Sequence, residues 1–313
     1  MDKRELMVTI SCLTYNHEPY IRQCLDGFVM QKTNFRFEAI VHDDASTDGT
    51  AAIIKEYAER YPDIIKPIFE IENQYSKRDG SLTRIMNSHM HGKYIAMCEG
   101  DDYWIDPLKL QKQVDFLEAH PNYGFSYTNV IIDQSDKNII IKRKTISISD
   151  NICDYLMTKN NPIITATVCM RKDIYMAFNL EKDKYEINML MGDLPLWIYA
   201  SKDKCVHFLD ERTTAYRLLL ESASHSKDPL KLRIFMENAK DIKLYMNSYY
   251  NLGYSEAAIW KNHYTNLLLQ MSQYSKEMLF DIIKDCIKQS PSSFLNWKVI
   301  YYILKGILYK KMD

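Results

Sequence analysis

An α/β fold with a mostly parallel, Rossmann-like sheet flanked by helices is predicted by three features of the sequence. Short apolar runs alternate with helix-like segments through four cycles, and strands joined in this way pair in parallel. Polar or acidic residues follow three of these strands, at the edge where such sheets bind ligands. From Pro229 onwards, the pattern predicts helices alone.

The first part of the chain predicts strands at 6–13, 37–42, 64–71 and 94–98, separated by helices that begin at Pro19, Thr50 and Ser81. The segments expected after these are a helix at 108–120, a strand at 124–132, an irregular hairpin at 133–149, a strand at 162–170, a short helix at 171–179, a helix entered through Pro195, and strands at 206–209 and 213–218.

The all-helical C-terminal region is expected to hold helices at about 230–249, 254–272, 275–289 and 294–311. The shift in composition places a domain boundary near residue 226. We therefore expect an α/β domain at 1–226 and a helical region at 227–313 that serves in packing, oligomerisation or membrane association.

The composition is that of an ordinary globular protein, with 46% hydrophobic and 26% charged residues among 313. Its 40 basic and 41 acidic residues nearly cancel, so no overall field attracts nucleic acid, and no nucleic-acid partner is expected. Seven scattered cysteines without a CxxC pair predict reduced thiols and a cytoplasmic location. No signal-peptide pattern and no run of about 20 apolar residues is present.

Three carboxylates occur within four residues at Glu99, Asp101 and Asp102, directly after the apolar run 94–98. Carboxylates crowded at the end of a buried strand repel one another and lose hydration, unless a cation lies among them. Mg²⁺ and Mn²⁺ prefer such oxygen ligands. The alternative is an acidic loop that caps the following helix.

Two further strand ends carry polar residues, Thr14-Tyr15-Asn16 and Asp43-Asp44. Because the carboxyl ends of parallel strands meet, a nucleotide and its cation could be held between these loops. Asp193 stands at the start of a later helix. It serves either as an N-cap, which contributes about 1 kcal/mol, or as a general base at a helix entrance.

The motifs Thr14-Tyr15-Asn16, Asp43-Asp44-Ala45-Ser46-Thr47-Asp48, Glu99-Gly100-Asp101-Asp102 and Gly192-Asp193, in this order, resemble those of family 2 glycosyltransferases. The resemblance covers roughly residues 6–225. It implies a GT-A (nucleotide-diphospho-sugar transferase) fold and an inverting, hexosyltransferase-like enzyme of bacterial surface-polysaccharide biosynthesis.

The resemblance also implies roles for single residues in donor binding. Tyr15, between Thr14 and Asn16, would flank the donor's base. Asp44 would accept the base N3–H, which favours uracil or thymine, and Arg78 would face the base or the pyrophosphate.

For the remaining positions, the resemblance places Asp101 near the ribose and the metal, Asp102 on a Mn²⁺ or Mg²⁺ ion, and Asp193 as the base that deprotonates the acceptor hydroxyl. Two departures from the family pattern leave further ligands open. Glu99 replaces the usual first aspartate of the DxD motif, and Leu219 stands where a histidine is common, with His225 nearby as a substitute or as a solvated loop residue.

The sequence therefore predicts metal-dependent transfer of a sugar from a nucleotide-diphosphate sugar, most simply a UDP-sugar, to a hydroxyl of a glycan or lipid-linked oligosaccharide. The alternatives are a sugar nucleotidyltransferase and a non-catalytic nucleotide- or glycan-binding module. The former usually needs a Gly-rich basic loop after the first strand, which Thr14-Tyr15-Asn16-His17 does not provide.

The segment 294–311 combines aliphatic residues with one Trp, three Tyr and four Lys. That composition is typical of a helix lying in an anionic membrane interface, which would place the protein at the inner face of the cell membrane. An ordinary amphipathic helix packed on its neighbours is the alternative.

Overall fold

The computed structural model describes residues 4–134, 139–142, 151–219, 228–271, 276–295, 300–301 and 303–304. The chain forms two compact units. The sheet unit comprises Met1–Asn151, Pro162–Tyr185 and Asp203–Leu218, and the helical unit comprises Ile152–Asn161, Glu186–Lys202 and Leu219–Asp313. The units interleave along the chain. The domain boundary expected near residue 226 lies outside the described residues and stays a prediction.

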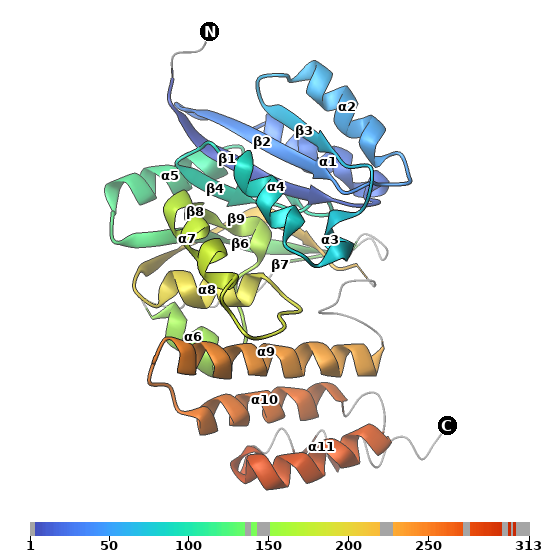
Figure 1. Ribbon diagram of the computed structural model, residues 1–313, viewed down its shortest axis with the longest axis vertical. Helices are drawn as coiled ribbons and strands as arrows, with labels where there is room; N and C mark the ends of the chain where they lie inside the picture. Colours follow the sequence, from blue (N-terminus) through green and yellow to red (C-terminus); the bar gives the residue numbers. More distant parts are fainter. Residues whose placement is uncertain are drawn as a thin grey trace. The chain divides into compact units, whose positions relative to one another are not determined.

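The sheet unit is built on one sheet with the strand order β3-β2-β1-β4-β8-β6-β9-β5, and β7 pairs with β6 beside this path (Figure 1). The strands are β1 (Leu6–Thr14), β2 (Arg36–Asp43), β3 (Ile65–Phe69), β4 (Tyr94–Met97), β5 (Tyr103–Trp104), β6 (Tyr123–Gln134), β7 (Ile139–Lys142), β8 (Cys169–Arg171) and β9 (Cys205–Arg217).

The sheet is mixed. Strands β1 to β4 pair in parallel, as expected for strands connected through helices. Beyond β4, strand β8 runs antiparallel to both β4 and β6, and β5 runs antiparallel to β9. The two strands expected at 206–209 and 213–218 form one continuous strand, β9, which pairs in parallel with β6 through irregular register.

The helices of the sheet unit are α1 (Glu18–Val29), α2 (Thr50–Arg60), α3 (Gln74–Lys77), α4 (Ser81–Ser88), α5 (Lys109–Ala119) and α7 (Lys172–Lys182). Helix α1 illustrates why they form. Pro19 lies in its first turn, and the buried Ile21, Leu25 and Phe28 follow at helical spacing. These side chains join the core with strands β1, β2 and β4. Of the strand expected at 162–170, only the last two residues belong to a strand, β8, and the 3₁₀ turn η2 (Thr165–Thr167) precedes it.

The helical unit contains α6 (Ile152–Thr158), α8 (Asp193–Ser201), α9 (Pro229–Tyr249), α10 (Glu256–Met271), α11 (Lys276–Gln289) and the 3₁₀ turn η4 (Pro291–Leu295). Helices α9, α10 and α11 lie in successive layers (Figure 1) around a core that includes Leu268, Ile282 and Cys286. No helix in the described ranges is long and apolar enough to cross a bilayer. Most of segment 294–311 lies outside these ranges, so its two alternatives stay predictions.

Candidate active site

The loop after β1 is joined to the loop after β2 by Asn16. Its side-chain Oδ1 accepts a hydrogen bond from the Thr47 amide at 2.8 Å, and its own amide donates to Ser46 Oγ at 2.9 Å. The next residue, His17, donates from its amide to Thr50 Oγ1 at 2.8 Å. The two loops therefore form one layer at the carboxyl edge of the sheet, where the sequence predicts a ligand.

Asp43 and Asp44 are both buried at the end of β2, and they have different partners. Asp43 Oδ1 accepts from Ser46 Oγ at 2.5 Å. Both carboxylate oxygens of Asp44 accept backbone hydrogen bonds, from Gln74 at 2.7 Å and from Tyr75 at 3.0 Å. Asp44 therefore fixes the start of the short helix α3 against the end of β2.

Three residues of these loops adopt left-handed backbone conformations without being glycine. They are Asn16 with φ 54° after β1, Ala45 with φ 62° after β2 and Arg78 with φ 52° at the end of α3. Such conformations cost of order 1 kcal/mol or more and cluster at functional sites. Asn251, with φ 51° after α9, has the same conformation, so the strain is not confined to this site.

The acidic loop follows β4. Ligand atoms of Glu99, Asp101 and Asp102 lie within 4.8 Å of one another. Asp102 is only 2% exposed, and one of its oxygens accepts the Arg217 amide at 2.9 Å. Burial raises the pKa of Asp102 well above its usual range, and the negative charges of Asp101 and Glu99 raise it further, whereas Arg217 opposes the shift.

Arg217, the last residue of β9, holds this loop from within the protein. Its guanidinium donates to the carbonyl of Asp101 and to Gln23 Oε1, and its Nε lies 3.7 Å from Asp133. The same group lies 4.5 Å from the centre of the Tyr103 ring. Arg217 is 5% exposed, so these interactions act in a poorly hydrated environment, where they are strong.

Gly100 lets the acidic loop approach the loop after β1. A Cβ at this position would lie 2.5 Å from Thr14 Cγ2 and 2.8 Å from His17 Nδ1, too close for any side chain. His17 Nδ1 is itself buried and has no hydrogen-bond partner among the described residues. Burial lowers the pKa of His17, against the opposing charges of Asp101 and Asp48. A neutral imidazole thus lies within electrostatic reach of the acidic loop.

The acidic loop fits a hard divalent cation. Its donors are carboxylate oxygens, the type that Mg²⁺ and Mn²⁺ prefer. Among the residues that the structure describes, none donates a hydrogen bond to the Asp101 carboxylate or to Oδ2 of Asp102. A cation there would offset the repulsion and the burial that make the ionised form of Asp102 unfavourable.

Asp193 belongs to the helical unit, at the first turn of α8. Gly192 occupies the N-cap position, so the interpretation of Asp193 as the N-cap is wrong by one residue. Its Oδ2 accepts a hydrogen bond from Asn161 Nδ2 at 3.0 Å. Burial raises the pKa of Asp193 above its ordinary value, and hydrogen bonds from Leu194 and Asn161 oppose the rise. A partly buried carboxylate with a raised pKa has the properties of a general base.

The structure brings together Thr14, Asn16, Glu99, Asp101 and Asp102 in the sheet unit, where Tyr15 is 46% exposed beside them. Arg78 is exposed at the end of α3, and among the described residues no side-chain hydrogen bond or ion pair joins it to Asp44. His225, the last predicted ligand, lies outside the described residues.

Two residues of this site were not predicted. Arg217 carried a signal, because it lies two residues before Leu219, the position where a histidine is common in the family. His17 carried no signal, since its buried position depends on Gly100, far away in the sequence.

Comparison with known proteins places the chain in a class and a family. Residues 9–177 match the family model described as Glycosyl transferase family 2. The fold resembles that of S. aureus TarS in complex with UDP-GlcNAc, with a TM-score of 0.56 and 17% identity over 87% of this chain and 74% of that chain. It also resembles the mannosyltransferase PcManGT from Pyrobaculum calidifontis in complex with GDP-Man and Mn²⁺, with a TM-score of 0.53 and 14% identity over 98% and 89% of the two chains.

Among curated relatives, an uncharacterised protein of Mycobacterium tuberculosis is 49% identical over 114 residues, 36% of this chain and 32% of that protein. The match thus spans about a third of that relative. Bacillus subtilis EpsE is 30% identical over 71% of this chain and 74% of its own. Escherichia coli UDP-Glc:alpha-D-GlcNAc-diphosphoundecaprenol beta-1,3-glucosyltransferase WfaP is 30% identical over 41% of this chain and 47% of its own.

The fold and the strand-end site define a GT-A glycosyltransferase architecture, which confirms the predicted fold class. The chain belongs to glycosyltransferase family 2.

If Arg217 holds the acidic loop, its replacement should lower the free energy of unfolding more than the loss of a surface ion pair does. Arg217→Met leaves buried carboxylates without their cation, and it should lower the free energy of unfolding by about 3–5 kcal/mol in urea titrations. Arg22→Met is the control, because Arg22 forms a two-contact pair with Glu56 that is half exposed on both sides, and it should leave stability nearly unchanged. Equal stability of the two variants would refute the role given to Arg217.

Proposed function

We propose that this protein transfers a sugar from a nucleotide-diphosphate sugar to a hydroxyl of a glycan or lipid-linked glycan, with inversion and with the help of Mn²⁺ or Mg²⁺. The single observation that carries the proposal is the acidic loop Glu99–Asp102, which Arg217 holds at the carboxyl edge of the sheet. Within the described part of the chain, the Asp101 carboxylate and Oδ2 of Asp102 receive no hydrogen bond. Family membership supports the reaction class.

The donor is proposed to be a UDP-sugar bound across the loops after β1, β2 and β4. Tyr15, half exposed, offers a ring face for a base. Asp44 is proposed as the acceptor of the base N3–H. Each carboxylate oxygen can accept a second hydrogen bond, so the backbone contacts to Gln74 and Tyr75 do not exclude this role. The complex of the structural relative TarS with UDP-GlcNAc supports this donor class.

Asp102 and Asp101 are proposed to hold the cation, with Glu99 as a further ligand or as a water-mediated one. When bound, such a cation neutralises charge that develops on the diphosphate leaving group. Arg78, exposed at the end of α3, is proposed to contact the base or the pyrophosphate. The Mn²⁺ complex of the relative PcManGT supports the choice of metal.

Asp193 is proposed as the general base for the acceptor hydroxyl. Asn161 orients its carboxylate, and its raised pKa increases its affinity for the proton that it must take. The relative WfaP is named for a diphosphoundecaprenol-linked acceptor, which supports a lipid-linked acceptor. We also propose that the protein works at the inner face of the cell membrane, where it would meet such an acceptor.

The proposed donor and metal predict metal-dependent nucleotide binding. Isothermal titration calorimetry should show that Mn²⁺ strengthens UDP binding to the full chain, because the cation links the carboxylates to the diphosphate. Asp102→Asn should abolish the effect of Mn²⁺ while UDP still binds. Ser88→Ala, at the exposed end of α4, is the control and should preserve the effect. Equal UDP affinity with and without Mn²⁺ in the wild type would contradict the proposal.

Asp193→Asn separates catalysis from helix structure. If Asp193 is the base, kcat should fall by about 10²–10⁴-fold while donor affinity and stability stay nearly unchanged. The wild-type rate should also fall as the pH is lowered, and this fall should begin above the ordinary pKa of an aspartate. The raised pKa of Asp193 means that the carboxylate becomes protonated, and stops acting as a base, at a higher pH. Turnover by the variant at near wild-type rate would exclude Asp193 from the reaction.

A further inference from the structure

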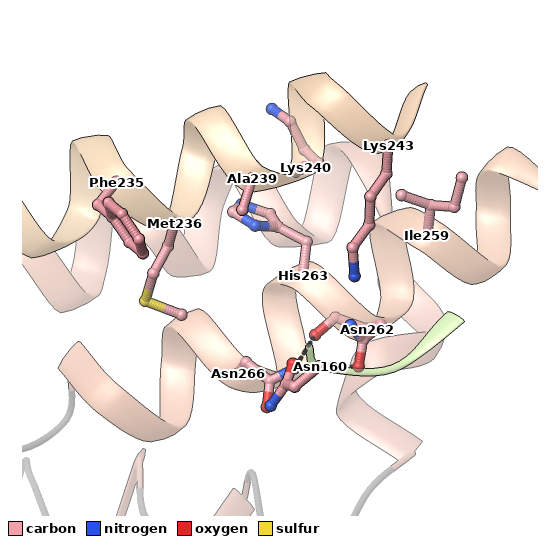
Figure 2. Close-up of a pocket in the computed structure, with 10 residues that line it drawn as sticks. All are labelled: Asn160, Phe235, Met236, Ala239, Lys240, Lys243, Ile259, Asn262, His263 and Asn266. Carbon is pink, nitrogen blue, oxygen red and sulfur yellow. Dashed lines mark hydrogen bonds between the residues drawn. The ribbon is translucent and has the colours of Figure 1, made fainter. Parts of the chain in front are cut away.

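A cavity of about 110 Å³ lies between α9 and α10 in the helical unit (Figure 2). This volume is several times the roughly 10–15 Å³ that one water needs, so the cavity has room for a small polar group. Its wall contains two lysines and three asparagines beside apolar side chains of Phe235, Met236 and Ile259. None of the roles proposed for the donor, the cation or the base uses it.

The two lysines in the wall differ in their partners. Lys240 Nζ lies 3.0 Å from Glu237 Oε2 and 3.1 Å from Asp241 Oδ1, and it lies 4.3 Å from the Trp260 ring centre. Lys243, one turn further along α9, is 7% exposed and donates one hydrogen bond, to the carbonyl of Lys159 at 2.5 Å. No carboxylate in the described part of the chain pairs with it.

Lys243 therefore keeps two ammonium donors without a described partner inside a cavity. In Figure 2 its amine points from α9 towards Asn262, whereas the amine of Lys240 points away from that residue. Burial alone lowers the pKa of Lys243 to about 8, so at neutral pH the amine is still protonated and its charge is buried without a counter-charge. An uncompensated buried charge is costly, and an anion in the cavity would remove that cost.

The cavity is connected to Asp193 through three consecutive residues. The Lys159 carbonyl accepts from both Lys243 and Asn262, the latter at 3.1 Å. Asn160 exchanges two hydrogen bonds with Asn266, at 3.1 and 2.8 Å. Asn161 donates to Asp193. Adjacent Cα atoms are about 3.8 Å apart, so the cavity wall and the partner of Asp193 are neighbours on one strip of backbone.

We propose that the cavity between α9 and α10 binds an anionic phosphoryl group of the acceptor, with Lys243 as its counter-charge. The proposal rests on the proposed function only in naming the acceptor as the source of the anion. Segment 159–161 would then link a bound acceptor to the orientation of Asp193. Lys243 would bind the anion and would take no part in the transfer of the sugar.

Amine labelling of the wild-type full chain tests the proposal without a variant. Lys243 and Lys240 are modified with a limiting acylating reagent and quantified by peptide mass spectrometry. Inorganic phosphate should slow modification of Lys243 and leave Lys240 unaffected. Lys240 is paired with Glu237 and Asp241, whereas no described carboxylate pairs with Lys243. An unchanged rate at Lys243 would overturn the proposal.

Two further probes identify the source of the anion. Geranyl diphosphate represents a lipid-linked phosphoryl group, and glucuronate represents a carboxylate on a glycan. Protection of Lys243 by geranyl diphosphate at lower concentration than by glucuronate supports the phosphoryl assignment. The reverse order would overturn it.

Variants give an independent measurement. Phosphate should raise the Tm of the wild type. Lys243→Met should need about tenfold more phosphate for the same rise, because it loses one charge-assisted hydrogen bond. Lys240→Met, the matched control on the same helix, should melt lower but keep the response. An equal response in wild type and Lys243→Met would contradict the site. UDP binding is measured separately by calorimetry. If UDP does not bind but phosphate still protects Lys243, the proposed function is wrong and the anion site in the cavity is supported.

Discussion

The buried guanidinium of Arg217 is the interaction on which the candidate donor site depends. It binds the carbonyl of Asp101, while the Arg217 amide binds the Asp102 carboxylate, so one residue of β9 fixes a loop that follows β4. Of the three carboxylates within 4.8 Å of one another, Asp102 is buried, Asp101 is partly buried and Glu99 is exposed, so their repulsion falls most heavily on Asp102. Arg217 compensates part of this negative charge, and a divalent cation would compensate more of it.

The loops after β1 and β2 are also held by hydrogen bonds, and they contain strained backbone conformations. Asn16 and Asp44 are held by several hydrogen bonds each, and Asn16, Ala45 and Arg78 have left-handed backbone conformations. Gly100 allows the acidic loop to touch the loop after β1. A preorganised edge of this kind binds a ligand without first ordering the loops, which lowers the entropic cost of binding.

Much of this was predictable from local pattern. The alternation of strands and helices predicted the parallel half of the sheet. The strand-end motifs predicted that Asp44, Asp101 and Asp102 follow strands of this sheet. Strand β9 was predicted as two pieces because its polar middle breaks the apolar run, although pairing with β6 keeps it continuous. The burial of His17 and the partners of Arg217 depend on contacts across more than 80 residues, for which a single sequence carries no local signal.

In the helical unit, segment 159–161 contacts both Asp193 and Lys243. Asn161 donates a hydrogen bond to Asp193, and the carbonyl of Lys159 accepts one from the buried Lys243 of α9. The cation proposed at the acidic loop can be located by anomalous diffraction at the manganese edge, from crystals grown with UDP and Mn²⁺. We expect one peak within about 2.5 Å of a carboxylate oxygen of Asp102 or Asp101 and adjacent to the diphosphate. A nucleotide bound at these loops with no manganese peak on either aspartate would contradict it.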